Sequence, residues 1–288
     1  MKQIIISLLL SLNSYALDKI YLDSPPSGDF SRRGYASELL TLSLEKTKKK
    51  YGPYEISHKE KMSRDRALRE MQTGTINVYD APTRNEWEEA TIPIFIPLTK
   101  GLLSYRLLLI KEKDRFKFSN VKEVDDLINL KAGLGSQWST TQVLKAIGGF
   151  QIVEGSSYEG LFTMLNAGRF DYFIRGVNEI FGEYENIKEK FEEIIIEQSL
   201  LLYIPMPMYF FVSKKHPELA KRIEEGLIIA INDGSFNETF LKHHKENIMK
   251  VDFKNRVFLN IGNPIYNKNI KYFGTKFWLD LESLRSIK

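Results

Sequence analysis

Residues 35–79, YASELLTLSLEKTKKKYGPYEISHKEKMSRDRALREMQTGTINVY, decide the fold class because short β-type runs alternate in them with amphipathic helical runs. Ser63 is placed to cap the second helix, and Gly74 follows its end. The predicted elements are a strand at 19–22, a helix at 35–49, a strand at 54–56, a helix at 63–73 and a strand at 76–79. This βαβαβ order predicts a mainly parallel sheet with right-handed crossovers.

The rest of the chain repeats this alternation, which indicates a second α/β unit. Strands are predicted at 102–110, 131–134, 151–153, 170–174, 193–196 and 208–212, and helices from 139, at 158–167 and at 177–191. Pro217 opens a further helix that ends at Gly234, and Ser235 with Glu238 predicts a capping box for the last one.

The composition excludes several classes of protein. With 288 residues, 43% apolar content and a mean hydropathy of −0.28, the chain is neither disordered nor a polytopic membrane protein. The net charge of +4 comes from interleaved bases and acids, which argues against a nucleic-acid partner. Cysteine is absent, the four histidines do not form a metal set, and no phosphate loop or dinucleotide fingerprint occurs. We therefore assign no cofactor, metal ligand or catalytic residue.

Residues 1–16 predict a signal peptide. A basic start precedes an apolar run at 4–12, and small residues stand at Ser14 and Ala16. Cleavage after Ala16 would release residues 17–288 into the periplasm. The alternative is a buried first strand.

Four segments together resemble the family 3 extracellular solute-binding proteins, the substrate-binding type of ABC transporters, over residues 18–245. They are YASELLTLSLEKT (35–47), TGTINVYDAPT (73–83), GRFDYFIRG (168–176) and HPELAKRIEEGLIIAINDGSF (216–236). The resemblance implies two α/β lobes, each a mainly parallel sheet flanked by helices, joined by two hinge strands around a ligand cleft. Lobe 1 would comprise residues 17–106 and 211–288, and lobe 2 residues 107–210.

The first candidate site residues lie where the chain leaves lobe 1. Asp80, Thr83 and Arg84 follow a strand, and in amino-acid-binding relatives this region supplies a threonine hydroxyl and an arginine that grips the α-carboxylate. Arg106 interrupts an apolar strand, which is costly unless the charge is paired or faces a wet cleft. The alternatives are a solvated loop arginine at 84 and a structural arginine at 106.

Further candidates lie in lobe 2. Trp138, Ser139 and Thr140 stand at a helix start, where hydroxyl and N–H groups receive carboxylate oxygens; the alternative is N-capping by Ser139 beside a core tryptophan. Tyr158 opens a helix after a strand and is a candidate for the cleft wall.

Arg175 is the most informative departure from the family pattern. Amino-acid-binding relatives have an aspartate near this position that holds the ligand α-amine, whereas this chain has a cation. Arg175 therefore favours an anionic or neutral ligand, although Asn178 and Glu179 keep an amine contact open. The alternative is an inter-domain salt bridge.

Three functions follow as hypotheses. The leading one is a monomeric periplasmic protein that captures a small polar, anionic or amino-acid-like solute for an ABC permease or a membrane sensor in trans. The second is a lyase of the cyclohexadienyl dehydratase type, with Glu159 or Glu179 as general acid or base. The third is a sensing module without a transport role. Fold alone does not choose among them.

Overall fold

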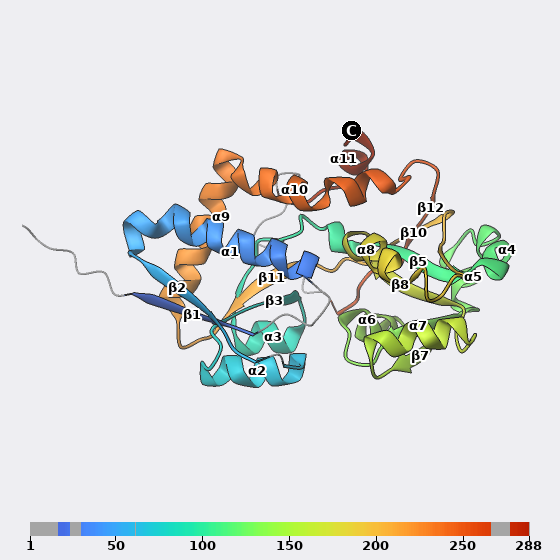
Figure 1. The fold of residues 1–288 in the computed structure, drawn as a ribbon, viewed down its shortest axis with the longest axis horizontal. Helices are drawn as coiled ribbons and strands as arrows, with labels where there is room; N and C mark the ends of the chain where they lie inside the picture. The colour runs from blue at the N-terminus through green and yellow to red at the C-terminus, as the bar shows by residue number, and fades with distance from the viewer. Residues whose placement is uncertain (1–16, 24–29, 61, 266–276, 288) are drawn as a thin grey trace, which may run out of the picture.

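The computed structural model describes residues 17–23, 30–60, 62–265 and 277–287, which form two α/β lobes side by side (Figure 1). The predicted signal peptide, residues 1–16, lies outside the described residues. Lobe 1 contains β1 (Asp18–Leu22), α1 (Phe30–Tyr51), β2 (Tyr54–His58), α2 (Arg64–Thr73), β3 (Val78–Pro82), α3 (Asn85–Ala90), β4 (Ile92–Ile94), β11 (Met208–Val212), α9 (Pro217–Asp233) and α10 (Ser235–Lys250). Lobe 2 contains β5 (Tyr105–Lys111), α4 (Arg115–Ser119), α5 (Val124–Ile128), β6 (Lys131–Gly135), α6 (Ser139–Ile147), β7 (Gln151–Gly155), α7 (Tyr158–Asn166), β8 (Tyr172–Gly176), α8 (Val177–Ile187), β9 (Ile194–Ile196), β10 (Leu200–Tyr203) and β12 (Val257–Asn260). The last helix, α11, spans Leu281–Ser286.

Lobe 1 holds two small sheets. β1 and β2 pair in parallel, whereas β11 pairs antiparallel with both β3 and β4. The buried Asn77 joins the two sheets, because its N–H donates to the Tyr21 carbonyl at 2.9 Å and its Oδ1 accepts from the Tyr21 N–H at 2.7 Å. The predicted βαβαβ order is therefore present, with a side-chain amide bridging the first and third strands.

Lobe 2 is built on one seven-stranded sheet of order β12-β10-β5-β8-β6-β7, with β9 also paired to β5. The β6–β7, β6–β8 and β10–β12 pairs are parallel, and all three pairs that β5 makes are antiparallel. β5 and β11 are the strands that follow the two crossings between the lobes. Each enters its sheet against the direction of its neighbours. The sheet of lobe 2 is therefore mixed, whereas lobe 1 has a parallel sheet of β1 and β2 and an antiparallel sheet of β3, β11 and β4. The two-lobed α/β architecture is confirmed.

The chain crosses between the lobes at residues 95–104 and 204–207. β5 begins in lobe 2 at Tyr105 and β11 begins in lobe 1 at Met208, so the crossings differ slightly from the predicted boundaries at 106 and 211. The segment after α10 departs more strongly from the prediction. Its strand β12 pairs with β10 in lobe 2, where it covers what would otherwise be an open sheet edge.

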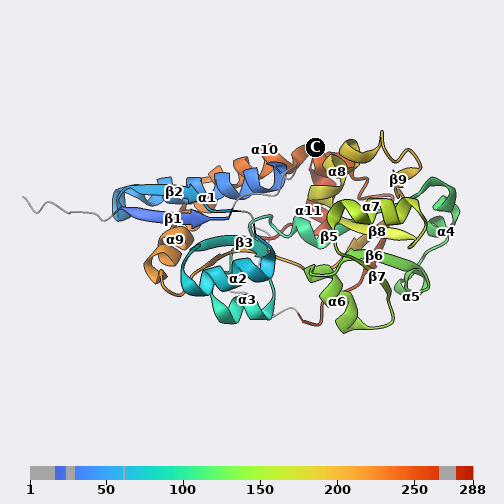
Figure 2. The same ribbon diagram turned by 60° about the horizontal axis from the view of Figure 1, so that its bottom comes forward.

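The C-terminal segment lies over both crossings. The Asn263 side chain donates to the Pro205 carbonyl at 2.7 Å, and the Leu279 N–H donates to the Lys100 carbonyl at 2.8 Å. α10 contacts α1 and α9 in lobe 1 and α8 in lobe 2, and it runs along one side of the molecule toward α8 (Figures 1 and 2). The two lobes are thus joined by the crossings and by this C-terminal segment.

Local signals explain the ends of α9. Pro217 occupies the first turn, and Gly234 adopts a left-handed φ of 90° directly after the helix. α9 packs closely on α1 at Gly226, where an added Cβ would lie 2.0 Å from the Ser43 carbonyl oxygen. The predicted capping box at Ser235 does not form, because the Ser235 hydroxyl donates to Asp233 at 2.6 Å.

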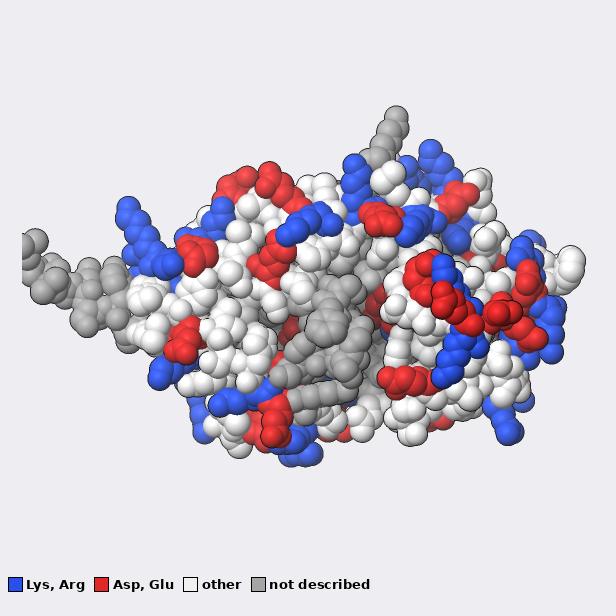
Figure 3. Space-filling view, in the orientation of Figure 1, with Lys and Arg blue, Asp and Glu red and all other residues white. Residues whose placement is uncertain are grey.

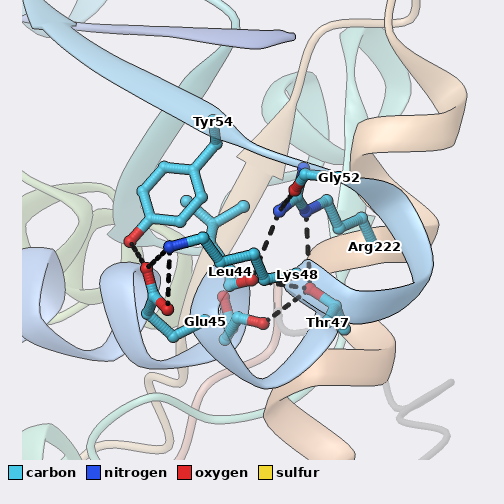
Figure 4. Close-up of polar contacts among 8 residues, drawn as sticks. Leu44, Glu45, Thr47, Lys48, Gly52, Tyr54 and Arg222 are labelled. Carbon is cyan, nitrogen blue, oxygen red and sulfur yellow. Dashed lines mark hydrogen bonds and ion pairs between the residues drawn. The ribbon is translucent and has the colours of Figure 1, made fainter. Parts of the chain in front are cut away.

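A fully buried arginine, Arg222, ties α9 to the C-terminal turns of α1 (Figure 4). Its Nη2 donates to the carbonyls of Gly52 at 2.8 Å and Leu44 at 3.3 Å, and its Nη1 donates to Asp18 at 2.7 Å. The guanidinium is thereby satisfied inside lobe 1.

The described surface carries both signs of charge. Over the face in Figure 3, lysine and arginine side chains are interspersed with aspartate and glutamate side chains. Among the described helices, none has the length and apolar character needed to cross a membrane.

Candidate functional site

Four charged side chains gather where β5 and β8 meet the start of α8. Arg106 lies opposite Gly176 in the β5–β8 register, and Arg175 is the preceding residue of β8. α8 begins directly after Gly176, which places Glu179 in its first turn and Glu183 one turn further. All four residues are buried or nearly so, with side-chain exposures of 4% for Arg106 and 8% for Arg175.

These four residues form a continuous chain of ion pairs. Arg175 forms a bidentate pair with Glu183: its Nε donates to Glu183 Oε2 at 2.6 Å, and its Nη2 donates to Glu183 Oε1. Glu179 Oε2 lies 3.3 Å from Arg175 Nη2 and 3.8 Å from Arg106 Nη1, and it also accepts the Gly176 N–H at 3.0 Å. Two positive and two negative charges therefore balance in the cluster.

The surroundings keep Arg175 charged. Burial by itself lowers the pKa of its guanidinium, but the charges of Glu179 and Glu183 raise that pKa above its ordinary value. For the Glu183 carboxyl, burial raises the pKa and the Arg175 guanidinium opposes the shift. Burial also raises the pKa of the Tyr158 phenol, with Glu183 adding to the effect.

Aromatic rings surround the Arg175 guanidinium. Its central carbon lies 4.8 Å from the ring centroid of Trp138, 5.2 Å from that of Phe173 and 5.6 Å from that of Tyr158. Trp138 stacks on Phe173 at 5.8 Å with 17° between the planes. Tyr158 is 36% exposed and forms the open side of this group. The arrangement suits a delocalised cation, which is attracted to ring faces and to carboxylates.

The hydroxyl-bearing start of α6 connects this cluster to lobe 1. Trp138 rather than Ser139 is the N-cap residue, and Ser139 and Thr140 are buried. The Ser139 hydroxyl accepts from Arg64 Nη1 of α2 at 3.4 Å. Met206, in the second crossing, contacts Thr140 Oγ1 at 3.9 Å and Arg106 Nη2 at 3.1 Å. The cluster therefore lies on the side of lobe 2 that faces lobe 1.

The lobe 1 candidates have their own partners. Arg84 is buried and lies 3.3 Å from Glu86 and 3.7 Å from Asp65. The Thr83 hydroxyl donates to Glu88 at 2.5 Å, and the half-buried Asp80 pairs with Phe210 in the sheet. Arg84 is linked to the lobe 2 candidates only indirectly. It lies near Asp65 at the start of α2, and the preceding residue, Arg64, contacts Ser139 of lobe 2.

The structure thus brings five predicted residues into one group, Arg106, Trp138, Thr140, Tyr158 and Arg175, with Ser139 at the contact with lobe 1. Arg175 pairs within lobe 2 rather than across the lobes. Sequence reasoning missed Glu183 and Arg64. The helical spacing of Glu179 and Glu183 was a usable signal for Glu183, whereas nothing local distinguishes Arg64.

A metal site is not apparent in the part of the chain that the structure describes. Among these residues, no group of three or more histidine, aspartate or glutamate side chains is placed to hold an ion. The chemistry available at the cluster is hydrogen bonding, ion pairing and ring stacking.

This two-lobed fold is the fold of periplasmic binding proteins, and comparison with known proteins supports it at the level of structure. No family model matches the chain, and no curated protein matches it. Solved structures do match. An amino acid ABC transporter substrate-binding protein from Streptococcus pneumoniae, bound to L-arginine, is 14% identical, with a TM-score of 0.55 over 78% of this chain and 93% of its own.

Two other similar structures are a sensor domain and an ancestral amino acid-binding protein. A histidine kinase sensor domain with similarity to periplasmic binding proteins is 16% identical, with a TM-score of 0.55 over 79% of this chain and 96% of its own. An ancestral amino acid-binding protein, a precursor of cyclohexadienyl dehydratase, is 15% identical, with a TM-score of 0.53 over 79% and 95%. At such identities the likeness establishes the fold. The predicted resemblance is confirmed to that extent.

Proposed function

We propose that this protein is a substrate-binding protein that captures a small polar, amino-acid-like solute between its lobes for an ABC permease or a membrane sensor in trans. The observation that carries the proposal is the cluster of Arg106, Arg175, Trp138 and Tyr158 on the side of lobe 2 facing lobe 1. Ligands of α/β proteins bind at strand ends beside helix N-termini, and the starts of α6 and α8 meet here.

The charges of the cluster limit the kinds of solute that the site would bind. Arg106 and Arg175 are balanced by Glu179 and Glu183, so the site offers less net positive potential than the two arginines alone would. A zwitterionic or neutral polar solute fits this balance better than a polyanion. Ser139, Thr140 and the free N–H groups expected at the start of α6 supply donors for a carboxylate.

Residues 95–104 and 204–207 are the proposed hinge of this binding protein. Asp80, Thr83 and Arg84 would face the solute from lobe 1 when the lobes approach each other, near Arg64 of α2, which already contacts Ser139. We also propose export to the periplasm with cleavage after Ala16. Intact mass measurement of protein recovered from the periplasm tests this, and an uncleaved chain would contradict it.

The lyase alternative finds less support. Glu159 is exposed on α7, and Glu179 is held by two arginines and a backbone N–H. A carboxylate held in this way is a poor general acid or base. Turnover of prephenate-type substrates by the purified protein would overturn this preference.

A thermal-shift screen tests the binding function directly. The purified protein, refolded to remove carried-over ligand, is tested against amino acids, dicarboxylates, polyamines and sugars. A solute at about 100 times its Kd adds about 2.7 kcal/mol, which raises Tm by several degrees at about 2–4 °C per kcal/mol. We expect a shift with neutral amino acids or similar zwitterions. No shift with any class would contradict the proposal.

A further inference from the structure

Arg175 occupies a position in lobe 2 that has the features of a receptor for a cation. Its guanidinium is paired by Glu183 through two contacts and by Glu179 at 3.3 Å, and it lies within 5.6 Å of three aromatic ring centroids. Carboxylates and ring faces are the two kinds of group that recognise guanidinium and ammonium ions. We call the group formed by Trp138, Tyr158, Phe173, Glu179 and Glu183 the cation slot.

The placement of Arg175 is unfavourable in one respect, which argues against a purely stabilising role. It precedes the N-cap residue of α8, and the positive end of a helix dipole disfavours a nearby cation. Glu179, in the first turn of α8, offsets this effect. A buried ion pair gives little net stability against apolar replacements, so stability alone does not account for the arrangement.

We infer that Arg175 is a resident cation that fills the slot, so that the inter-lobe site rejects solutes with a basic side chain. The slot is next to the start of α6, where Ser139 meets lobe 1, and Tyr158 leaves it partly open. A solute that carried a guanidinium or ammonium group into this place would meet a like charge and filled space. The statement about selectivity rests on the proposed function, whereas the statement about the slot does not.

Removal of Arg175 tests the slot with small probes. The Arg175→Ala variant leaves two buried carboxylates facing the rings, and we expect methylguanidinium to raise its Tm by several degrees. Methylurea has the same shape without the charge and should give no shift. Wild type should respond to neither probe, and Arg175→Ala/Glu183→Gln should lose most of the methylguanidinium response.

The slot can also be tested if the Arg175→Ala variant does not fold without an added probe. In that case, recovery of the native circular dichroism signal is measured after refolding with methylguanidinium or with methylurea, and recovery with methylguanidinium only supports the slot. An equal effect of the two probes, or no effect of either, overturns it. The Arg175→Lys variant keeps a cation in place and should remain insensitive to methylguanidinium.

Selectivity is measured with L-arginine and with the neutral amino acid that gives the largest shift in the thermal screen. Wild type should bind the neutral solute and not L-arginine, and Arg175→Ala should gain L-arginine binding. Binding of L-arginine by wild type would overturn the selectivity. If wild type binds no solute while Arg175→Ala still responds to methylguanidinium, the slot stands and the proposed function fails. If wild type binds a solute while Arg175→Ala shows no response to methylguanidinium, the proposed function stands and the slot fails.

Discussion

Arg222 in lobe 1 and Arg175 in lobe 2 are both buried arginines near carboxylates and aromatic rings, but Arg222 also donates to backbone carbonyls. Arg222 donates to the carbonyl of Leu44 in α1 and to that of Gly52 directly after α1 (Figure 4). Its Nη1 donates to Asp18, the first residue of β1. Arg175 lies before the N-terminus of α8 and is held by two carboxylates and by aromatic rings. The helix dipole favours the first position and disfavours the second.

The difference separates a structural arginine from a functional candidate. Gly52 directly follows the last residue of α1, so Arg222 donates to a carbonyl that the end of the helix leaves without an intrahelical donor. Glu179 and Glu183 are side chains whose charges exist only because this sequence supplies them. Arg222 lies inside lobe 1, whereas Arg175 lies on the side of lobe 2 that faces lobe 1. If the two arginines have these different roles, removing Arg222 should destabilise the protein more than removing a partner of Arg175 does.

The largest effect is expected for Arg222→Met. It leaves the buried Gly52 carbonyl without its donor and the partly exposed Asp18 without its partner, while the Leu44 carbonyl keeps the Thr47 hydroxyl as a donor. The free energy of unfolding should therefore fall by about 3 kcal/mol. Guanidinium chloride denaturation measures it. Lys50→Met is the matched control, because Lys50 joins the same two helices through an exposed pair with Glu225 and should change stability little. Similar losses in both variants would contradict the structural role of Arg222.

Glu183→Gln should have a smaller effect, about 2 kcal/mol, because Arg175 loses its bidentate partner but keeps Glu179. Urea denaturation of the wild type and the variant gives the difference. Glu185→Gln, on an exposed part of the same helix, provides the control. A loss as large as that of Arg222→Met would place the Arg175 pair in the same structural category as Arg222.

His244 shows what happens to a buried basic side chain without a carboxylate. It packs edge-on against Tyr35 at 4.5 Å and near Phe240, and burial lowers its pKa from 6.5 to about 3. The unfolded chain therefore takes up a proton below pH 6.5 that the folded chain does not accept until about pH 3. Stability should fall by about 1.4 kcal/mol per pH unit as the pH decreases through this window.

His244→Leu removes this titration, so its stability should depend less on pH than that of the wild type. Denaturation midpoints at pH 7.0 and 5.5 give the two slopes. Equal slopes would mean that His244 is protonated in the folded protein.

Local signals made much of the fold predictable. The helix from Pro217 to Gly234 has a proline in its first turn, a periodic apolar face and a left-handed glycine after its end, and all three act within the helix itself. The crossing strands were harder. Nothing in the sequence of β5 or β11 indicates that each pairs antiparallel with its neighbours, since strand direction depends on where the chain re-enters a sheet.

The candidate site was predictable where a charge interrupts an apolar strand. Arg106 met that criterion, whereas Arg175 was a candidate because it departs from the pattern of amino-acid-binding relatives, and both lie in the cluster. The partner that balances Arg175 was not predicted, because Glu183 reads as an ordinary polar position of an amphipathic helix until the packing of α8 is known. β12 was missed for a related reason. Four residues show no clear period, and their partner β10 lies far away in the sequence.

Arg256 provides the smallest expected effect and the closest parallel to Arg222. Its Nη1 donates to the carbonyls of Glu197 and Leu200 at 2.8 and 2.9 Å, beside the parallel β10–β12 pair. Arg256→Gln should lower the free energy of unfolding by about 1 kcal/mol, since the glutamine amide can still donate to one of these carbonyls. The buried Glu197 carboxylate, 3.9 Å from Arg256 Nη1, keeps its hydrogen bonds from Ser199 and Leu200.

Hydrogen exchange followed by mass spectrometry should localise the effect of Arg256→Gln to peptides that contain β10 and β12, with unchanged exchange in α1 and α9. That pattern would mean that the C-terminal segment can loosen from lobe 2 while lobe 1 stays folded. Faster exchange in α1 and α9 as well would mean that the segment and lobe 1 unfold as one unit. In that case Arg256 and Arg222 would support one cooperative structure, and Arg175 would be the buried arginine that stands apart.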